Sequence, residues 1–216
     1  MYQFSNTLVE KNVEIPLHLL RLFKEGNIYL PCWYVYYYKG DVPTVIYAQG
    51  HPYVQRQSLY HLDENEIEEA QTFIESTIMP FVFPYVKLAH DNYELSYNVP
   101  DDSLAFLTLM ISLEVLFKPE RKSKFSGEIV RNVGTLLGNS QYSIGKIQWD
   151  IYDLYTKRSE LVHEGKNIRC AVGEDDDLTN LRGYVRRSLK KIIQINRSKD
   201  VLLDYLSNPI GKSGVL

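Results

Sequence analysis

Two side chains near the end of a long amphipathic stretch could do chemistry: Arg158 and His163, in the run KRSELVHEG. A histidine titrates near pH ~6.5, so a modest upward shift makes His163 a proton donor or acceptor at cellular pH. Arg158 carries a permanent charge at a position where the helical pattern requires an apolar residue. A charge placed there is costly unless it is paired or reaches an opening in the fold.

The residues that must position this pair are predicted to form a helix over 143–165. Steps of three and four residues give an apolar stripe that reaches Arg158 and continues beyond it: Ile144, Ile147, Ile151, Leu154, Leu161. Gly165 is a natural C-terminal cap and places His163 in the last turn, where the helix dipole favours the imidazolium. On a straight helix the two side chains point about 140° apart. They can converge if the last turn frays or if a second copy of the helix packs alongside.

Both residues also have ordinary structural interpretations. Arg158 can snorkel to solvent or pair with a carboxylate, for which Glu114, Asp150 and Asp153 are candidates. His163 can be no more than a favourable charge at a helix end. The residue types by themselves leave these alternatives open.

The run LYTKRSELVHEGK resembles the signature of the HEPN superfamily, helical domains found in prokaryotic nucleases, toxins and nucleotidyltransferase partners. The family motif is an arginine, four to six residues and a histidine, usually with a polar residue after the arginine; here these are Arg158, Ser159 and His163. The glycine after the histidine, the earlier segment LTLMISLEVLF and a basic helix after the motif are similar to the Apea-like HEPN group. The similarity covers roughly residues 60–200.

The resemblance implies a metal-independent endoribonuclease in which two copies share one cleft. The ribose 2′-hydroxyl attacks its own 3′-phosphate and leaves a cyclic phosphate and a 5′-hydroxyl. His163 would be the general acid or base, Arg158 would bind the phosphate, and Ser159 would orient it or donate a hydrogen bond. The resemblance also implies no metal or other cofactor, RNA as the substrate, and a homodimer formed through helix 143–165. By analogy it adds a role in phage defence or toxin-like growth control, with an antitoxin or regulatory partner.

A second candidate surface is the basic helix predicted over 174–198. Five of its basic residues are candidates for RNA binding: Arg182, Arg186, Arg187, Lys190 and Lys191. Concentrated positive charge of this kind can guide a phosphate backbone, although a solvated helix face has the same composition. The acidic run EDDD at 174–177 is interpreted as an N-terminal helix cap rather than a site for a divalent ion.

Composition sets limits on the class of protein. The chain has 216 residues, 44% of them hydrophobic, and a net charge of −3, which argues against coating nucleic acid by bulk charge. Two distant cysteines, Cys32 and Cys170, make no disulfide framework and favour a reducing, cytoplasmic setting. The longest apolar run, 104–117, is too short for a membrane span and contains Glu114, and no signal peptide is recognised.

The predicted fold class is mainly α: an HEPN-like helical bundle over 61–216, preceded by a small α+β segment over 1–60. The small segment combines a helix over 16–26 with a β-hairpin formed by 33–38 and 44–48. The remaining predicted helices of the bundle are 63–77, 84–97, 101–117, 125–138 and 199–207. The helix over 101–117 has an almost wholly apolar body, which predicts that it is the central one.

Two other functions remain open from the sequence. The first is a non-catalytic HEPN module that binds RNA, a nucleotide or a partner protein. The second is a regulatory subunit of a larger system, with the N-terminal hairpin docked elsewhere.

Overall fold

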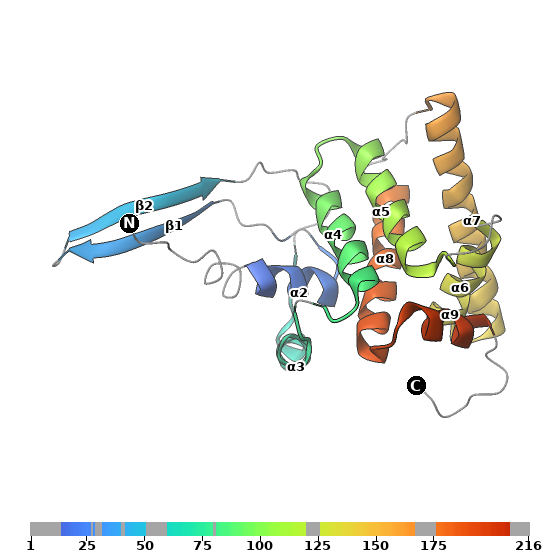
Figure 1. The fold of residues 1–216 in the computed structure, drawn as a ribbon, viewed down its shortest axis with the longest axis horizontal. Helices are drawn as coiled ribbons and strands as arrows, with labels where there is room; N and C mark the ends of the chain where they lie inside the picture. The colour runs from blue at the N-terminus through green and yellow to red at the C-terminus, as the bar shows by residue number, and fades with distance from the viewer. Residues whose placement is uncertain are drawn as a thin grey trace.

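The computed structural model describes residues 14–26, 28, 32–39, 42–50, 60–79, 81–119, 126–166 and 176–207. Most of these residues are helical, and the helices pack into a bundle, which confirms the mainly helical class (Figure 1). The elements of the bundle are α2 (Ile15–Phe23), a 3-10 turn η2 (Glu64–Glu66), α3 (Ile67–Ser76), α4 (Pro84–Asn98), α5 (Asp102–Phe117), α6 (Ser126–Leu137), α7 (Gln141–Glu164), α8 (Asp177–Ile195) and α9 (Lys199–Ser207). Among these helices, none combines the length and the apolar character needed to cross a bilayer.

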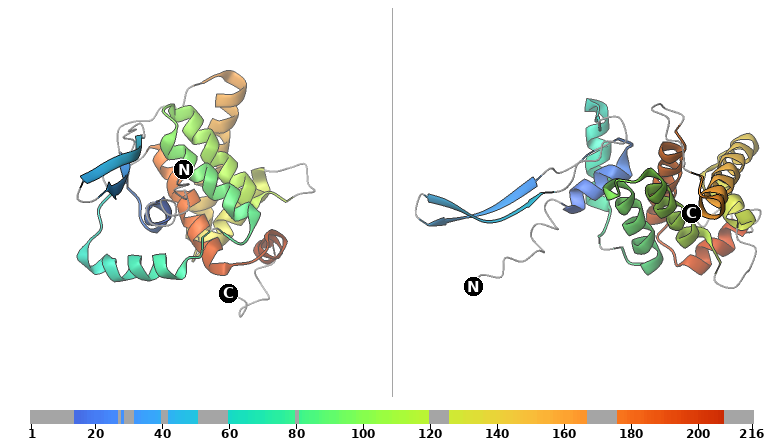
Figure 2. Two further views of the ribbon diagram at one scale, coloured as in Figure 1. Left: turned by 60° about the vertical axis from the view of Figure 1, so that its left-hand side comes forward. Right: turned by 90° about the horizontal axis from the view of Figure 1, so that it is seen from above.

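Two strands, β1 (Cys32–Lys39) and β2 (Val42–Gly50), pair antiparallel with a register shift between Val35 and Tyr36. They lie between α2 and α3 in the chain. Figures 1 and 2 show this hairpin extending away from the helices. In contrast, α2 itself belongs to the bundle, because Leu19 and Leu22 are buried in the same core as the later helices.

Polar caps set the ends of the helices close to where the sequence predicts them. Asp101 accepts a hydrogen bond from the backbone N–H of Leu104 and starts α5, and Asp176 caps α8 in the same way through the N–H of Leu178. Ser140 and Ser143 form a capping box that starts α7 two residues before the predicted position. The helix over 16–26 is shorter than predicted and ends at Phe23.

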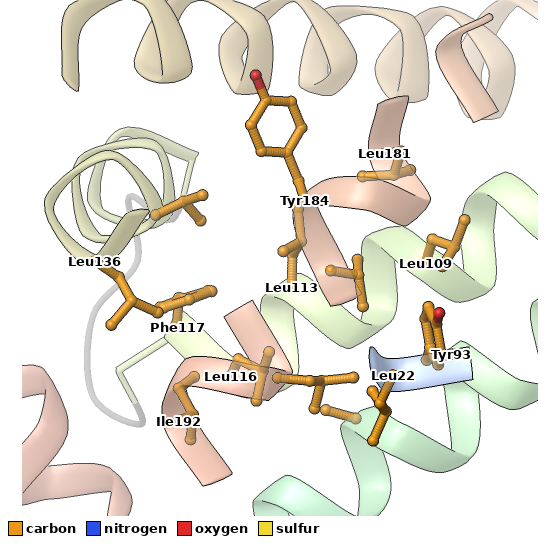
Figure 3. Close-up of a cluster of buried hydrophobic side chains, with 14 of the residues drawn as sticks. Leu22, Tyr93, Leu109, Leu113, Leu116, Phe117, Leu136, Leu181, Tyr184 and Ile192 are labelled. Carbon is orange, nitrogen blue, oxygen red and sulfur yellow. The ribbon is translucent and has the colours of Figure 1, made fainter. Parts of the chain in front are cut away.

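The central position predicted for α5 is confirmed. Its buried residues cover more than half of the helix circumference, whereas Leu104 and Ile111 on the remaining side are exposed. The buried residues are Ala105, Phe106, Thr108, Leu109, Met110, Ser112, Leu113, Leu116 and Phe117. Figure 3 shows Leu113, Leu116 and Phe117 within a cluster to which α6, α8 and α4 also contribute. The backbone of α5 is therefore held by close packing along its length.

Candidate functional site

The motif residues lie in the last two turns of α7. The helix continues without a break to Glu164, and Gly165 follows in the left-handed conformation with φ 65°. This confirms the predicted cap and places His163 in the last turn. Because the last turn does not fray, the offset of about 140° between Arg158 and His163 persists within one copy.

The apolar stripe of α7 becomes less buried toward the end of the helix, although Leu161, beyond Arg158, still packs against the core. Ile147, Ile151 and Leu154 are buried, whereas the Arg158 side chain, one turn further on, is 36% exposed. In Figure 1 the end of α7 that carries the motif, drawn in orange, extends past the neighbouring end of α5. Arg158 therefore lies at the rim of the bundle rather than within it, which accounts for a charge on this stripe.

Arg158 is paired with a carboxylate, as one of the sequence interpretations predicts. Its Nη2 lies 3.4 Å from Oε1 of Glu114 on α5. The other two candidates have different partners: Asp150 accepts a hydrogen bond from the hydroxyl of Tyr184, and Asp153 pairs with Lys157 at 2.7 Å. Glu114 thus joins the motif to the central helix.

Tyr155 lies close to this ion pair, one turn before Arg158. Burial raises the pKa of its phenol, the negative charge of Glu114 raises that pKa further, and the charge of Arg158 opposes both effects. The buried hydroxyl of Tyr155 has no hydrogen-bond partner among the described residues. Sequence analysis did not single out this residue, because a tyrosine beside an apolar stripe is ordinary core composition.

Ser159 and His163 are both exposed and lie four residues apart, so they share one face of α7. Neither side chain has a recorded hydrogen bond to the part of the chain that the structure describes. They lie around the helix from Arg158, in the direction of solvent. A single copy therefore presents Arg158, which can bind a phosphate, and His163, which can transfer a proton, on neighbouring faces of one accessible helix end.

The same outer side of α7 carries large aromatic side chains that the sequence analysis did not identify. Tyr142 is 84% exposed, Trp149 is 69% exposed and Tyr152 is 56% exposed. The rings of Trp149 and Tyr152 lie 6.3 Å apart. Their spacing of seven and three residues places them on one face, and this second periodicity in α7 is the signal by which the sequence could have revealed them.

The structure corrects one RNA-binding assignment on α8. Arg182 is 1% exposed, and its Nε and Nη2 donate to the hydroxyl and the carbonyl of Ser96. Its guanidinium also lies 4.5 Å from the ring centroid of Tyr97. A side chain buried this deeply cannot contact a polynucleotide, so the prediction for Arg182 is wrong.

The other basic residues of α8 are also engaged within the fold. Arg186 donates to a backbone carbonyl at the end of α2 at 3.1 Å, and Lys191 donates to a carbonyl at the end of α6 at 2.8 Å. Lys190 lies 3.8 Å from a glutamate on α3, and Arg187 stacks over the ring of Tyr184. Much of the positive charge on α8 thus attaches this helix to its neighbours rather than forming an open basic face.

Metal-ligating residue types are dispersed over the described helices. Within residues 14–26, 60–79, 81–119, 126–166 and 176–207, no three His, Cys, Asp or Glu side chains are grouped so that they could hold an ion. Of the acidic run, Asp176 and Asp177 are described: the first caps α8 and the second pairs with Lys157 at 2.7 Å. Glu174 and Asp175 lie outside the described residues, as does Cys170.

The arrangement thus joins an accessible arginine, its carboxylate partner and an exposed serine and histidine at one helix end. No family model matches this chain, and no curated protein or solved structure matches it either.

Proposed function

We propose that this chain is a metal-independent endoribonuclease of the HEPN type, which acts in the cytoplasm as a homodimer. The observation that supports it most directly is the position of Arg158, which lies on the apolar stripe and yet reaches solvent at the end of α7. An arginine in the core could not contact a polynucleotide, whereas this one can. Ser159 and His163 are exposed in the same two turns.

In the proposed reaction the 2′-hydroxyl of one ribose attacks the adjacent phosphorus and gives its proton to a base. The bond from phosphorus to the 5′ oxygen breaks, and this oxygen takes a proton from an acid. His163 would serve as acid or base, a role that contributes about 10²- to 10⁴-fold. Arg158 would stabilise the charge on the phosphate, and Ser159 would orient it. The products are a cyclic phosphate and a 5′-hydroxyl, and DNA is excluded because it lacks the 2′-hydroxyl.

A second copy of the chain completes this site in the proposal. Arg158 and His163 point about 140° apart on one straight helix, so one copy does not direct both at the same phosphate. Two α7 helices packed side by side would bring residues of both copies to one cleft. The exposed face formed by Tyr142, Trp149 and Tyr152 supports this arrangement, because large aromatic side chains are enriched at interfaces.

The test is direct cleavage. The purified protein is incubated with labelled RNA in EDTA, beside Arg158→Ala and His163→Ala. Matched controls are Arg131→Ala and His61→Ala, which change an arginine and a histidine on other parts of the bundle surface. We expect cyclic-phosphate ends from the wild type and both controls, and a loss of about 100-fold or more in both motif variants. A single 2′-deoxynucleotide at the cut position should block cleavage there.

Cleavage that persists in both motif variants would show that the site is elsewhere. Absence of cleavage on every RNA tested would favour the second candidate, a non-catalytic HEPN module that binds RNA, a nucleotide or a partner protein. The engagement of the α8 basic residues within the fold favours this candidate, because it leaves less free positive charge to guide a phosphate backbone. Binding without cleavage, measured by fluorescence anisotropy, distinguishes the two.

The proposed biological role is phage defence or toxin-like growth control, with an antitoxin or regulatory partner. It predicts that expression arrests bacterial growth and that Arg158→Ala relieves the arrest.

A further inference from the structure

Glu114 is the residue through which the central helix contacts the motif. Its Oε1 lies 3.4 Å from Nη2 of Arg158, and its side chain is 25% exposed. The adjacent residue Leu113, and Leu116 and Phe117 in the next turn, are fully buried. The carboxylate therefore stands on one of the most tightly packed segments of the bundle and at the edge of the proposed cleft.

An arginine that binds a transition state must be held in place before the substrate arrives. The free arginine side chain has many rotamers, and this conformational entropy is lost when the guanidinium is fixed. A carboxylate on a rigid helix can order the guanidinium in the folded protein, so that less entropy is lost when the substrate binds. The guanidinium has five N–H donors, and the recorded contact with Glu114 uses one nitrogen, so donors remain for a phosphate.

The partial exposure of the Arg158 and Glu114 side chains fits a positioning role better than a purely structural one. The ion pair of Arg21 with Glu94 elsewhere in this bundle has both side chains less than a tenth exposed, whereas Arg158 is 36% exposed and Glu114 is 25% exposed. A wet, single contact contributes little to the free energy of unfolding. It can nevertheless restrict the directions in which the guanidinium points.

We propose that Glu114 is a positioning residue that holds Nη2 of Arg158, so that the remaining guanidinium donors face the scissile phosphate. Glu114 acts through Arg158 and does not touch the substrate. The inference rests on the proposed ribonuclease function, and it adds a fourth residue to the site, which comes from α5 rather than from the motif itself.

The test compares Glu114→Gln with Glu160→Gln. The second variant removes a carboxylate that lies between Arg158 and His163 in the sequence but pairs with Lys166 at 3.6 Å rather than with Arg158. Two readouts are used: NMR of the guanidinium groups in protein labelled with ¹⁵N-arginine, with the Arg158 signal assigned by its loss in Arg158→Ala, and single-turnover cleavage of RNA. We expect Glu114→Gln to mobilise the Arg158 signal and to slow cleavage about 10- to 100-fold, because a misplaced catalytic group can cost up to about 100-fold in rate. Glu160→Gln should change neither.

The outcomes separate this inference from the proposed function. An Arg158 signal that stays ordered in Glu114→Gln overturns the positioning role whether or not RNA is cleaved. A mobilised signal with an unchanged cleavage rate also overturns it. If the signal is mobilised but the wild type cleaves no RNA, Glu114 does hold Arg158 in place. The ribonuclease function is then rejected, and with it any role of Glu114 in cleavage.

Discussion

Arg21 of α2 and Glu94 of α4 form an ion pair inside the bundle, with both side chains less than a tenth exposed. The same guanidinium donates two hydrogen bonds to the carbonyl of Ile28, and Nε2 of His18 lies 3.4 Å from the Glu94 carboxylate. This contact attaches the helix that precedes the hairpin to the helices that carry the core.

Removing the cation of this pair should strongly destabilise the protein. Arg21→Met leaves Glu94 buried without its partner, and we expect a loss of about 3–5 kcal/mol in the free energy of unfolding. Urea denaturation at pH 7 measures it. Lys87→Met is the control, because it breaks an exposed ion pair with Asp91 and should cost less than about 1 kcal/mol. Equal losses in the two variants would contradict the burial of the Arg21 pair.

Stability should fall on acidification in a window set by His90. Burial lowers the pKa of this side chain to about 4, from 6.5, and the neighbouring Glu94 opposes the shift while His18 adds to it. The unfolded chain therefore takes up a proton at a pH where the native state does not. From this group, stability is lost as the pH falls from about 6.5 to about 4, by on the order of 3 kcal/mol, with no further loss below.

Urea denaturation at a series of pH values tests this dependence. His90→Phe keeps an aromatic ring beside Phe81 and should flatten the curve between pH 6.5 and 4. His61→Phe, at an exposed position, should leave the curve unchanged. A curve for His90→Phe with the wild-type slope would show that other groups cause the dependence.

Tyr155→Phe should leave stability unchanged or raise it. Within the part of the chain that the structure describes, the buried hydroxyl has no hydrogen-bond partner, and an unsatisfied buried polar group costs about 1–3 kcal/mol. Tyr93→Phe is the matched comparison, because that hydroxyl donates to the carbonyl of Arg21 at 2.8 Å, and its loss should cost about 1 kcal/mol. Thermal unfolding should therefore show a lower midpoint for Tyr93→Phe and an unchanged or higher midpoint for Tyr155→Phe; a marked drop for Tyr155→Phe would be inconsistent with an unpaired hydroxyl.

Gly145 within α7 and Gly165 directly after it should respond in opposite directions to substitution by alanine. A Cβ at Gly145 or at Gly165 would meet no atom within 4 Å, but Gly165 has φ +65° and Gly145 has a helical conformation. Gly145→Ala should stabilise by about 0.5–1 kcal/mol through helix propensity. Gly165→Ala should destabilise by about 1 kcal/mol and loosen the turn that holds His163. Denaturant midpoints measure both changes.

The outer face of α7 should control self-association. Trp149→Asp places a charge at the centre of the exposed aromatic face and should weaken dimerisation at least 10-fold, because a buried unpaired charge is costly. Ile78→Asp changes an equally exposed apolar side chain between α3 and α4 and should have no effect. Analytical ultracentrifugation of the two variants and the wild type checks this, and a wild type that stays monomeric at working concentration would count against the shared cleft.

Local sequence rules predicted the helices because their signals act over a few residues. Asp101 and Asp176 cap the helices that follow them, and Gly165 ends α7 where a left-handed residue is required, whereas the cap at Ser140 was not predicted. The apolar body of α5 predicted its central place, since a helix that is apolar on most sides is expected to pack against several neighbours, and α5 contacts α4, α6, α7, α8 and α9. The same periodicity marked Arg158 as an arginine on a stripe that should face the core.

Arg182 shows where that analysis was incomplete. It follows Leu178 by four residues and precedes Val185 by three, so it lies on the apolar stripe of α8, as Arg158 lies on that of α7. Its charge groups Arg182 with the other basic residues of α8, although its spacing places it on the apolar stripe. The sequence could have indicated that Arg182 points inward, but not that Ser96 and Tyr97 of α4 receive it there.

By itself the sequence determined the helical class, the caps and the position of two arginines on apolar stripes, because these depend on neighbours within one or two turns. The tertiary structure decided which of the two arginines is exposed and which is buried. Arg158 lies at the edge of the packing between α7 and α5, so it reaches solvent beside Glu114, whereas α8 packs against α4 and α5, so Arg182 is enclosed. The physical reason is that burial depends on which helices pack alongside, and that is fixed by contacts between residues far apart in the chain.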